Sequence, residues 1–527
     1  MGFYSSIFIK FTEFGKISEI ISLIFPKKMY LCGVKQKWKA MVIDELVEKQ
    51  MITRMRLDNP WWSSGVIRED FKALMPRAYL DSFHSMVSNM GVKRAFILMG
   101  PRRVGKTVML YHSIQRFIND GVSPQNLIYL SVETPIYNGI SLEQLMNIAF
   151  KAVGKAFSSE ERYYVFFDEV QYLKDWEIHL KSLVDAFPNV RFVASGSAAA
   201  ALKKKSIESG AGRFTDFHLP PLLFYEYLQL HHQEHLIKES EVNWNGQPTP
   251  ILESTDIQRL NELFIDYINY GGYPEVAFNT EIQADPGQYI RHDIIDKVLM
   301  RDLPILYGIT DVQELNSMFT MIAYLSGNQF SFESLAQNTG VKKDTLRKYL
   351  EYLEAAFLIK TIHRTDNTAK RYQRERNFKI YLTNPSLRCA LFQPITTADA
   401  EIGEMVETAV IAQWVPRLGA NVSYANWRLG KKEMGEVDIV GINAARQKPD
   451  WAVEVKWSDR YFENPNELSS LKAYMETNHL TQALVTTMTQ SGLVGQSWGN
   501  LQFMPAACYA YLVGRNTLKR VKSRVGF

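Results

Sequence analysis

One eight-residue segment constrains the fold of this chain more than any other feature of its sequence. Residues 100–107 read Gly-Pro-Arg-Arg-Val-Gly-Lys-Thr and fit the pattern GxxxxGK[ST]. The apolar run Ala95–Met99 precedes them, and a helical pattern from Lys106 to Phe117 follows. The glycines let backbone N–H groups curl around phosphate oxygens, and the N-terminus of the following helix favours an anion. The segment therefore predicts a strand–loop–helix unit that binds phosphate.

Several side chains of this phosphate loop have an expected role. Lys106 is placed to reach the β- and γ-phosphates of a nucleoside triphosphate, and the Thr107 hydroxyl is placed to ligate Mg²⁺. We therefore expect ATP and Mg²⁺ as cofactors. The other positions expected to contact the nucleotide are Gly100, Pro101, Arg102, Arg103, Val104 and Gly105.

A pair of acids ends a later strand pattern. Tyr163–Glu169 reads YYVFFDE, so an apolar run is followed directly by Asp168 and Glu169. Ligands of open α/β sheets bind at the carboxyl ends of the strands. Asp168 is expected to hold the Mg²⁺ of ATP, and Glu169 to polarise the attacking water as a general base. Together with the phosphate loop, this pair predicts ATP hydrolysis.

Two further segments offer residues for the γ-phosphate. The next apolar run ends in a polar stretch with Ser195 and Ser197, where a side chain can sense that phosphate. Arg213 stands in the sequence AGRF, and a positive charge near the γ-phosphate stabilises the transition state. We expect both serines at the nucleotide and Arg213 in catalysis with Lys106 and Glu169. Ordinary loop serines and a surface arginine would give the same pattern.

The spacing of apolar runs predicts an α/β fold around this site. Short apolar runs alternate with helical segments, which is typical of a parallel sheet buried on both faces. The strand-like runs are Ala95–Met99, Leu127–Ser131, Tyr163–Phe167 and Val190–Ala194.

The composition narrows the class of protein. The chain has 527 residues, 46% hydrophobic and 12% aromatic, so we expect little disorder and several domains. A net charge of +4 permits nucleic-acid contact in patches without indicating it. The three cysteines, Cys32, Cys389 and Cys508, show no CxxC spacing, so neither a disulfide framework nor a zinc site is expected. A reducing, cytoplasmic location fits best.

The apolar run Ile17–Phe25 is the one N-terminal stretch that resembles a membrane or targeting signal. Glu19 interrupts it, and it is much shorter than the ~20 residues that span a bilayer. It does not end in a small-residue cleavage site. We expect a packed or disordered leader, with Met29 as an alternative start, and no membrane contact anywhere in the chain.

Six segments follow one another in an order typical of one family. They are GPRRVGKT (100–107), VFFDEVQYLKDWE (165–177), ASGSAAAAL (194–202), GRFTDFHLPPLLFYEYL (212–228), GGYPEVA (271–277) and RDLP (301–304). Together they resemble the AAA+ ATPases of bacteria and archaea that carry a C-terminal domain of unknown function. The resemblance implies a core ATPase, a winged helix and a nuclease-like C-terminal fold. It also makes Arg213 a candidate finger for a neighbouring subunit, and so implies a homo-oligomer.

We therefore expect an α/β protein with five parts. These are an N-terminal helical segment (1–65), an AAA+ P-loop ATPase core with a parallel sheet (66–225), a helical lid (226–310), a winged helix (311–385) and a restriction-endonuclease-like α/β domain (386–527).

Residues 332–358 carry the expected winged helix. They read as two helices joined by a tight turn at Gly340, as in a helix-turn-helix. One interpretation is a module that contacts DNA through its basic residues, and the other is a module that packs on the ATPase. The basic residues of the second helix and of the following hairpin are Lys342, Lys343, Arg347, Lys348, Arg364, Lys370, Arg371, Arg374 and Arg376.

Two strand patterns near the C-terminus bring acids into register. Gly435–Ile442 and Trp451–Ser458 alternate in polarity and are joined by a polar turn. If that hairpin centres on residue 446, Asp438 faces Glu454 at ~5 Å. Two facing carboxylates repel each other unless a cation neutralises them, and Mg²⁺ suits such ligands. The register therefore predicts a metal site.

Lys456 and Glu407 complete this candidate site. Lys456 is two residues beyond Glu454, so it shares the same face and is placed to orient or activate a water. Glu407, on the preceding helix, is a candidate third carboxylate. The order helix Glu, then Asp, then ExK resembles the PD-(D/E)xK nucleases, although Val437 stands where that family has proline. Charged residues on a solvated hairpin face would give the same pattern.

Three functions remain open for this ATPase. The first is a regulatory or remodelling ATPase whose C-terminal modules bind partners or DNA. The second is an ATP-coupled DNA nuclease. The third is a non-hydrolysing, ATP-dependent binding switch, such as a transcription regulator. Glu169 argues against the third, because a pure binder needs no residue to polarise water.

Overall fold

The computed structural model describes residues 44–197, 212–244, 247–370, 377–417, 422–428, 434–443 and 445–525. Met1–Asp44 and Glu45–Phe527 are separate units, and the fold below is that of the second. The expected leader and the basic residues Arg371, Arg374 and Arg376 lie outside the described residues.

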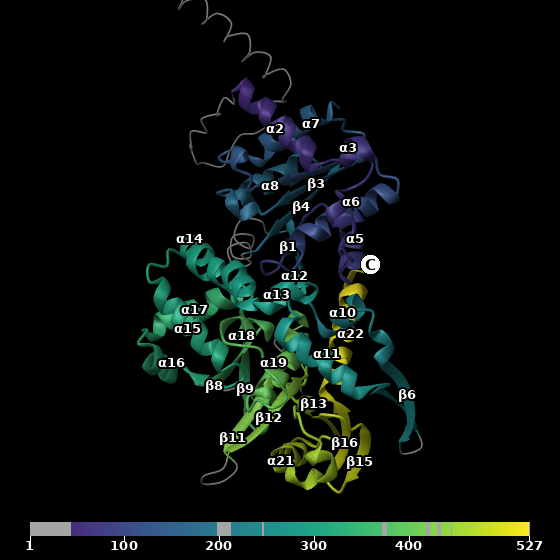
Figure 1. Ribbon diagram of the computed structural model, residues 1–527, viewed down its shortest axis with the longest axis vertical. Coiled ribbons are helices and arrows are strands. Elements are labelled where there is room, and N and C mark those ends of the chain that lie inside the picture. The colour runs from purple at the N-terminus through teal and green to yellow at the C-terminus, as the bar shows by residue number, and fades with distance from the viewer. Residues whose placement is uncertain are drawn as a thin grey trace, which may run out of the picture. The chain divides into compact units, whose positions relative to one another are not determined.

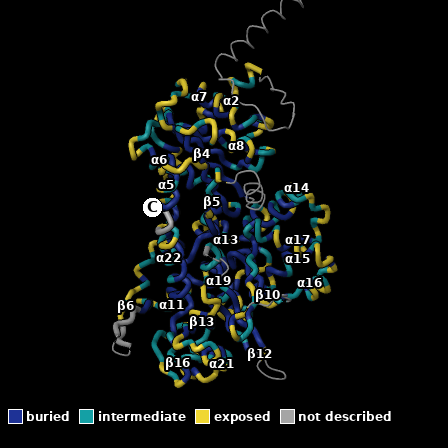
Figure 2. The backbone as a smooth tube through the Cα atoms, turned by 180° about the vertical axis from the view of Figure 1, so that it is seen from behind, coloured by how far each residue is buried: buried dark blue, intermediate teal, exposed yellow. Residues whose placement is uncertain are grey.

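A parallel sheet of five strands forms the first part of the described chain. Its order is β2-β3-β4-β1-β5, and β1 to β4 are buried over almost their whole length, whereas β5 is mostly half-buried (Figure 2). The expected parallel α/β core is confirmed, but the fifth strand was missed because FTDFH is short and half polar. The strands are β1 (Ala95–Met99), β2 (Leu127–Ser131), β3 (Tyr163–Asp168), β4 (Val190–Gly196) and β5 (Phe214–His218).

Helices cover both faces of this sheet (Figure 1). The chain crosses from β1 to β2 in one direction and from β2 through β3 to β4 in the other, so right-handed crossovers put the connecting helices on opposite faces. One face has α6 (Lys106–Asn119), against which α4 (Glu69–Lys72) and α5 (Leu80–Ser88) pack. The other has α7 (Leu142–Val153) and α8 (Trp176–Ala186), which contact each other.

The residues just before this core pack onto it. Helix α2 (Glu45–Asp58) contacts α7 and β2, and α3 (Trp61–Ser64) follows it. The side chain of Asn59 bonds to both the backbone oxygen and the N–H of Tyr129 in β2, at 2.9 and 2.7 Å. From residue 45 onward, the expected N-terminal segment is therefore attached to the sheet, a relation that helical periodicity does not reveal.

A mostly helical region follows the sheet, as the sequence predicts, and it breaks between α11 and α12 at the sequence GGYP (271–274). The β6–β7 hairpin within it was not expected, because its first strand is rich in charge. The elements are α10 (Phe224–Leu230), β6 (Ile237–Trp244), β7 (Gln247–Ser254), α11 (Ile257–Tyr270), α12 (Pro274–Ala277), α13 (Thr280–Ala284), the π-helical segments η5 (Gly287–Asp296) and η6 (Val298–Asp302), and α14 (Leu303–Tyr307).

The next region contains the two helices expected around Gly340, which adopts a left-handed φ of 74° between them. An antiparallel β9–β10 pair follows them, in the place expected for a wing. This order agrees with a winged helix, which stays a prediction. The elements are α15 (Val312–Tyr324), β8 (Gln329–Ser331), α16 (Phe332–Thr339), α17 (Lys343–Ala355), β9 (Ile359–Thr365) and β10 (Asn377–Leu382).

The C-terminal region is a mixed sheet with helices. Strand β11 pairs in parallel with β9, so one nine-stranded sheet, β15-β16-β14-β13-β12-β11-β9-β10-β8, continues across the expected limit at residue 385. The elements are α18 (Ser386–Leu391), α19 (Ile402–Trp414), β11 (Val422–Arg428), β12 (Met434–Ile442), β13 (Pro449–Glu454), α20 (Arg460–Glu463), α21 (Ser469–Asn478), β14 (Gln482–Thr487), β15 (Gly492–Gln496), β16 (Gly499–Pro505) and α22 (Ala506–Val525).

Apolar packing joins the regions that the sequence separates. One core contains Leu98 of β1 together with Leu299 and Leu387, and a second contains Leu222 together with Val406. The C-terminal helix α22, yellow in Figure 1, returns to contact α10 and α5. The expected limits at residues 225, 310 and 385 thus fall within shared cores. Among the described helices, none combines the length and apolarity needed to cross a bilayer.

Candidate functional site

The parallel register aligns the functional ends of three strands at one edge of the sheet. Met99, which leads into the phosphate loop, lies beside Gly196 of β4. Phe167 lies beside Ala194, so Asp168 and Ser195 follow at the same level. Phosphate loop, acidic pair and serine stretch therefore meet at one edge, as the sequence predicts.

Two glycines give the phosphate loop its shape. A Cβ atom on Gly100 would lie 2.2 Å from the backbone oxygen of Leu219, which is closer than real Cβ atoms approach. Gly105 has a left-handed φ of 90° at the start of α6. A side chain at the first position would push the loop away from Leu219, which directly follows β5, and one at the second would strain the turn that starts the helix.

Lys106 is held inside the loop. Its Nζ donates to the backbone oxygens of Gly100 and Pro101, at 3.1 and 2.9 Å. Burial lowers the pKa of Lys106, and the nearby carboxylates of Glu169 and Asp168 oppose that shift. A phosphate oxygen would be a stronger, charge-assisted acceptor than either carbonyl, so this lysine is positioned for the role expected of it.

Asp168 is the centre of a hydroxyl network. Its Oδ2 accepts from Thr107 Oγ1 at 2.7 Å and from the Tyr129 hydroxyl at 2.8 Å, and its Oδ1 accepts from the Ser195 hydroxyl. Burial raises the pKa of Asp168, and the neighbouring Glu169 raises it further. Oxygen atoms of Thr107 and Asp168 are in direct contact, and oxygen is the ligand type that Mg²⁺ prefers, so their role as Mg²⁺ ligands stays a prediction. Tyr129 was missed, because a tyrosine inside the run LIYLS reads as core.

Glu169 starts the turn after β3 and has a left-handed φ of 55°. Its N–H donates to Ser195 Oγ at 3.2 Å, and its carboxylate accepts from the Gln171 amide. The same amide donates to Ser197 Oγ at 3.2 Å. The two serines are thus tied to the acids, one directly and one through Gln171, which the sequence did not single out.

The two loop arginines contact acids far along the chain. Arg102 binds Asp302 with two hydrogen bonds, of 2.8 and 2.9 Å, in a partly buried pair. Arg103 binds Glu275 at 2.9 Å and Asp293 at 2.7 Å. Both positions are expected to contact the nucleotide, which stays a prediction; in this structure their side chains pair with carboxylates of the helical region.

A buried ion pair connects the phosphate loop to α10. Arg77 binds Glu226 of α10 through two hydrogen bonds of 2.9 Å. The same guanidinium donates to the backbone oxygens of Val104 at 2.6 Å and Pro220 at 3.0 Å. Neither residue was predicted. Glu226 lies in the matched segment LLFYEYL, but no local pattern connects it to an arginine so far away.

Arg213 lies away from its own phosphate loop. Its backbone oxygen accepts from the N–H of Ala95, and its side chain forms a half-exposed pair with Asp185 at 2.5 Å. Because β5 runs parallel to β1, Arg213 is at the start of β1, and the loop begins at its other end, ~15 Å away along the strand. Only action on a neighbouring subunit remains open for this residue.

The expected C-terminal hairpin register holds. Ile439 of β12 lies opposite Val453 of β13, so the next residues outward, Asp438 and Glu454, face each other. Asp438 Oδ2 also accepts from the N–H of Val455 at 2.8 Å. Both carboxylates are buried.

Lys456 and Glu407 join this cluster as expected. Lys456 Nζ lies 2.8 Å from Glu454 Oε1 and 3.6 Å from Asp438 Oδ2. Glu407 is linked through a second lysine, Lys379, whose Nζ lies 2.9 Å from Glu407 Oε1 and 3.8 Å from Asp438 Oδ1. The structure therefore brings all four predicted residues together.

Three members of the cluster were not predicted. Lys379 also pairs with Glu436 at 2.8 Å, and the Tyr381 hydroxyl donates to Glu407 at 2.5 Å. Lys379 and Tyr381 come from β10, which the sequence placed in a separate winged helix. No pattern within one segment could show that β10 belongs to the same sheet as β12, with β9 and β11 between them.

The cluster carries more carboxylates than ammonium groups. Burial raises the pKa of Glu454 to about 7, with Asp438 adding to the rise, and burial also raises the pKa of Glu407. The buried Oε2 of Glu454 has no hydrogen-bond partner among the described residues. In that same part of the chain, no three His, Cys, Asp or Glu side chains are arranged to hold a metal ion. The metal site thus stays a prediction.

The basic face of α17 is partly engaged within the chain. Lys343 pairs with Glu333 at 2.7 Å, and the Arg347 guanidinium lies 4.9 Å from the centre of the Phe332 ring. Arg364 donates to the backbone oxygen of Asn426 at 3.0 Å, so it faces the sheet. Contact between these basic residues and DNA therefore stays a prediction.

Two family models match the chain. The first is described as an AAA domain and covers residues 92–228, which contain the phosphate loop, the acidic pair and Glu226. The second is a domain of unknown function (DUF8612) and covers residues 261–398, which contain Asp302, Glu275 and Asp293. The loop arginines therefore reach from the first matched region to the second. The expected AAA-type ATPase core is confirmed, whereas neither model bears on the nuclease-like prediction.

Curated relatives are similar over much of the chain. An uncharacterized protein of Haemophilus influenzae is 24% identical over 380 residues, which is 71% of this chain and 85% of that protein. The uncharacterized protein MJ1637 of Methanocaldococcus jannaschii is 26% identical over 371 residues, 68% of this chain and 74% of the other. The similarity thus extends well beyond the AAA domain.

Solved structures align at low similarity. The Aeropyrum pernix ORC1 protein in complex with DNA has a TM-score of 0.30 and 11% identity, with 63% of this chain and 95% of that chain covered. A Thermotoga maritima RuvB variant has a TM-score of 0.26 and 15% identity, with 55% and 91% covered. TM-scores this low do not establish a shared fold over the aligned length.

Proposed function

We propose that this chain, which carries the AAA domain of P-loop ATPases, binds Mg-ATP at residues 100–107 and hydrolyses it. The observation that carries the proposal is the contact of Thr107 with Asp168, 2.7 Å apart, with Glu169 immediately beyond. A residue that can polarise water thus adjoins the two oxygen ligands expected for the metal.

Each residue of this site has a role in the proposal. Lys106 leaves the loop carbonyls for the β- and γ-phosphates. Thr107 and Asp168 would hold Mg²⁺, which when bound neutralises phosphate charge. Glu169 takes the proton of the attacking water, and Gln171 orients its carboxylate by hydrogen bonding.

The contacts of the loop arginines favour a regulatory or remodelling ATPase. Arg102 and Arg103 are held by acids of residues 261–398, so a nucleotide that recruits either arginine must loosen that attachment. ATP binding would then change how this region is held. Partners or DNA would be contacted through the C-terminal modules.

Nucleotide binding and phosphate release test the proposal. Lys106→Ala removes the charge that meets the phosphates and should abolish ATP binding. Lys49→Ala, at an exposed surface pair, is a matched control and should bind as wild type does. Retained binding by folded Lys106→Ala, or the absence of phosphate release by wild type, would contradict it; binding without release would favour the ATP-dependent switch.

A second candidate function is metal-dependent DNA cleavage at the C-terminal cluster. It is favoured by the convergence of Glu407, Asp438, Glu454 and Lys456, and by the unpartnered Oε2 of Glu454. Carboxylates in excess of ammonium groups suit a divalent cation. A cation would have to displace part of the ion-pair network around the lysines.

Mg²⁺ or Mn²⁺ binding tests this second function. Binding should raise the melting temperature of the full chain carrying Lys106→Ala, which removes the ATP site from the measurement. The gain is about 2.7 kcal/mol at a hundredfold excess of ion over its dissociation constant. Asp438→Asn should remove the gain, and Lys456→Ala should keep it but lose DNA cleavage. An unchanged melting temperature with no DNA cut would leave the cluster as an ion-pair network.

A further inference from the structure

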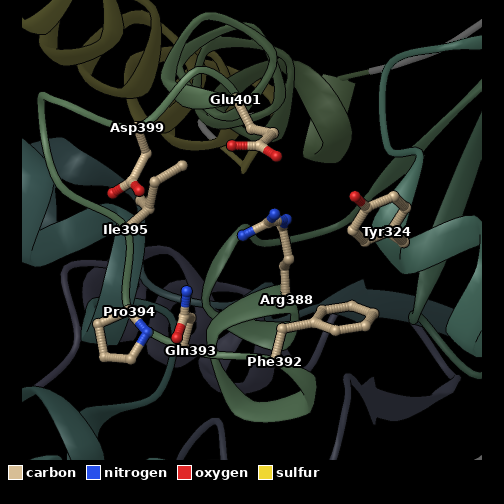
Figure 3. Close-up of a pocket in the computed structure, with 8 residues that line it drawn as sticks. All are labelled: Tyr324, Arg388, Phe392, Gln393, Pro394, Ile395, Asp399 and Glu401. Carbon is tan, nitrogen blue, oxygen red and sulfur yellow. The ribbon is translucent and has the colours of Figure 1, made fainter.

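A cavity of about 370 Å³ lies around the side chain of Arg388 (Figure 3). It is bounded by the end of α15, by α18 and by the segment that leads to α19. Its size is in the range of pockets that hold small molecules, about 300–1,000 Å³. Neither the ATP proposal nor the cluster at Asp438 uses its residues.

Arg388 of α18 extends into this cavity (Figure 3). The residue is only 7% exposed, and its buried Nε has no hydrogen-bond partner among the described residues. A guanidinium remains charged at every physiological pH, so it cannot escape burial by losing its proton. A buried guanidinium N–H without an acceptor is costly, which points to an anionic group of a ligand.

Two aromatic rings flank this guanidinium. Its Cζ lies 5.8 Å from the centre of the Tyr324 ring and 5.6 Å from that of Phe392, within the range of cation–π attraction. These rings stabilise the guanidinium charge. They do not occupy its N–H donors, as a hydrogen-bond acceptor would. The donors are then available for a planar acceptor with two oxygens, which is the geometry of a carboxylate.

The same rings offer an apolar surface. Tyr324 is 52% exposed and Phe392 is 40% exposed, although both are large hydrophobic side chains, and their ring centres are 5.4 Å apart. An apolar or aromatic group of a ligand would bury part of this surface. Apolar walls with a few placed polar groups are typical of small-molecule sites.

Two carboxylates border the cavity, opposite the aromatic rings (Figure 3). Among the described residues, neither Asp399 nor Glu401 forms an ion pair with Arg388 within 4 Å, so the interaction of Asp399 with Arg388 is longer-ranged. Asp399 accepts from the N–H and hydroxyl of Thr396, both at 2.7 Å; these bonds lower the pKa of Asp399, and the charge of Arg388 lowers it further. Two acids and one arginine disfavour a doubly charged phosphate but suit a ligand that also carries an ammonium group.

The cavity wall is a fixed part of the fold. The N–H and the backbone oxygen of Ile395 both bond to the side chain of buried Asn269 in α11, each at 2.8 Å. These two hydrogen bonds hold the segment between α18 and α19 against the helical region. The polar and apolar walls therefore keep a defined spacing.

We propose that this cavity binds a free α-amino acid with an apolar side chain. Its carboxylate is bound by Arg388, its ammonium group by Glu401, and its side chain by the rings of Tyr324 and Phe392. A ligand that lacks either charge leaves Arg388 or Glu401 without its partner, so both charges contribute to affinity.

Calorimetry with the full chain tests the proposal with four probes. These are L-phenylalanine, 3-phenylpropionate, which lacks the ammonium group, phenethylamine, which lacks the carboxylate, and inorganic phosphate. L-phenylalanine should bind at least about tenfold more tightly than the other three, because each of them loses a charged hydrogen bond. Failure of all four to bind, or tighter binding of phosphate, would overturn the proposal.

Three variants locate the binding. Glu401→Gln should weaken L-phenylalanine about tenfold and leave 3-phenylpropionate unchanged, because it removes the acceptor for the ammonium group. Tyr324→Ala, at an exposed ring, should weaken both. Glu404→Gln, exposed on α19, is the matched control and should change neither. Equal effects of Glu401→Gln and Glu404→Gln would place any binding elsewhere and overturn the proposal.

Because the proposed ATP site shares no residue with this cavity, Lys106→Ala should bind L-phenylalanine normally.

Discussion

Arg102 in the phosphate loop and Asp302 in the helical region, two hundred residues later in the chain, form a bidentate pair with hydrogen bonds of 2.8 and 2.9 Å. The loop that is expected to bind ATP is therefore attached to the region that the DUF8612 model covers. Such a pair is partly shielded from water and has defined geometry, so it contributes more than an exposed pair. Asp302 also competes with a phosphate of ATP for Arg102, since the carboxylate and the phosphate are both anions that bind a guanidinium.

This competition predicts that Asp302→Asn strengthens ATP binding. The amide keeps the size of the carboxylate but loses its charge, so Arg102 is released to the phosphates. We expect ATP affinity to rise about fivefold or more, the lower end of measured coupling between sites. Titration with a fluorescent ATP analogue measures it, with exposed Glu281→Gln as the control. Unchanged or weaker binding would show that the pair does not compete with the nucleotide.

The pair of Arg77 with Glu226 predicts a large effect on stability. Both side chains are almost fully buried, so Glu226→Gln leaves an uncompensated buried charge. The free energy of unfolding should fall by about 3–5 kcal/mol. Asp70→Asn at the exposed pair with Arg68 should cost at most about 1 kcal/mol. Urea unfolding compares the two, and similar small losses would mean that the buried pair does not stabilise the loop.

Arg213 is predicted to act on the ATP of a neighbouring subunit. Arg213→Ala should bind ATP normally and hydrolyse it poorly, because a guanidinium meets the charge of the transition state. Mixing Arg213→Ala with Glu169→Gln should restore part of the activity, since each variant supplies what the other lacks. Arg162→Ala, an exposed arginine of the same core, is the control. Co-assembled variants that fail to complement each other would exclude this role.

Lys379 is predicted to be essential for the C-terminal cluster. Its ammonium lies within 4 Å of carboxylates from Glu407, Glu436 and Asp438, so Lys379→Met removes their shared counter-charge. We expect a loss of about 3–5 kcal/mol in unfolding free energy without metal. Exposed Lys348→Met should change little. Wild-type stability of folded Lys379→Met would show that the acids are neutralised in another way.

The sequence predicted those parts of the nucleotide site that depend on local pattern. The run Ala95–Met99 is β1, and Asp168 and Ser195 meet beside the loop, because strand ends in a parallel sheet align at one edge. Tyr129 and Gln171 were missed. Each acts through a side-chain contact across strands or turns, and neither residue type signals such a contact.

The parts that the sequence could not supply depend on contacts between distant segments. Asp302 and Glu226 lie in matched segments, but nothing in those segments shows that their partners are Arg102 and Arg77. Lys379 was assigned to a different domain from Asp438, and only the pairing of β9 with β11 brings them together. The hairpin register was predictable, since it depends on one turn and a period of two residues.

The measurement that tests the account most directly is the effect of Glu169→Gln on ATP binding and turnover in the same preparation. The amide can hold the shape of the site but cannot take a proton from water. The account predicts ATP binding equal to wild type and turnover lower by about 100-fold or more, whereas Glu160→Gln, exposed in the same core, should change neither. Wild-type turnover by Glu169→Gln would contradict the proposed mechanism of hydrolysis.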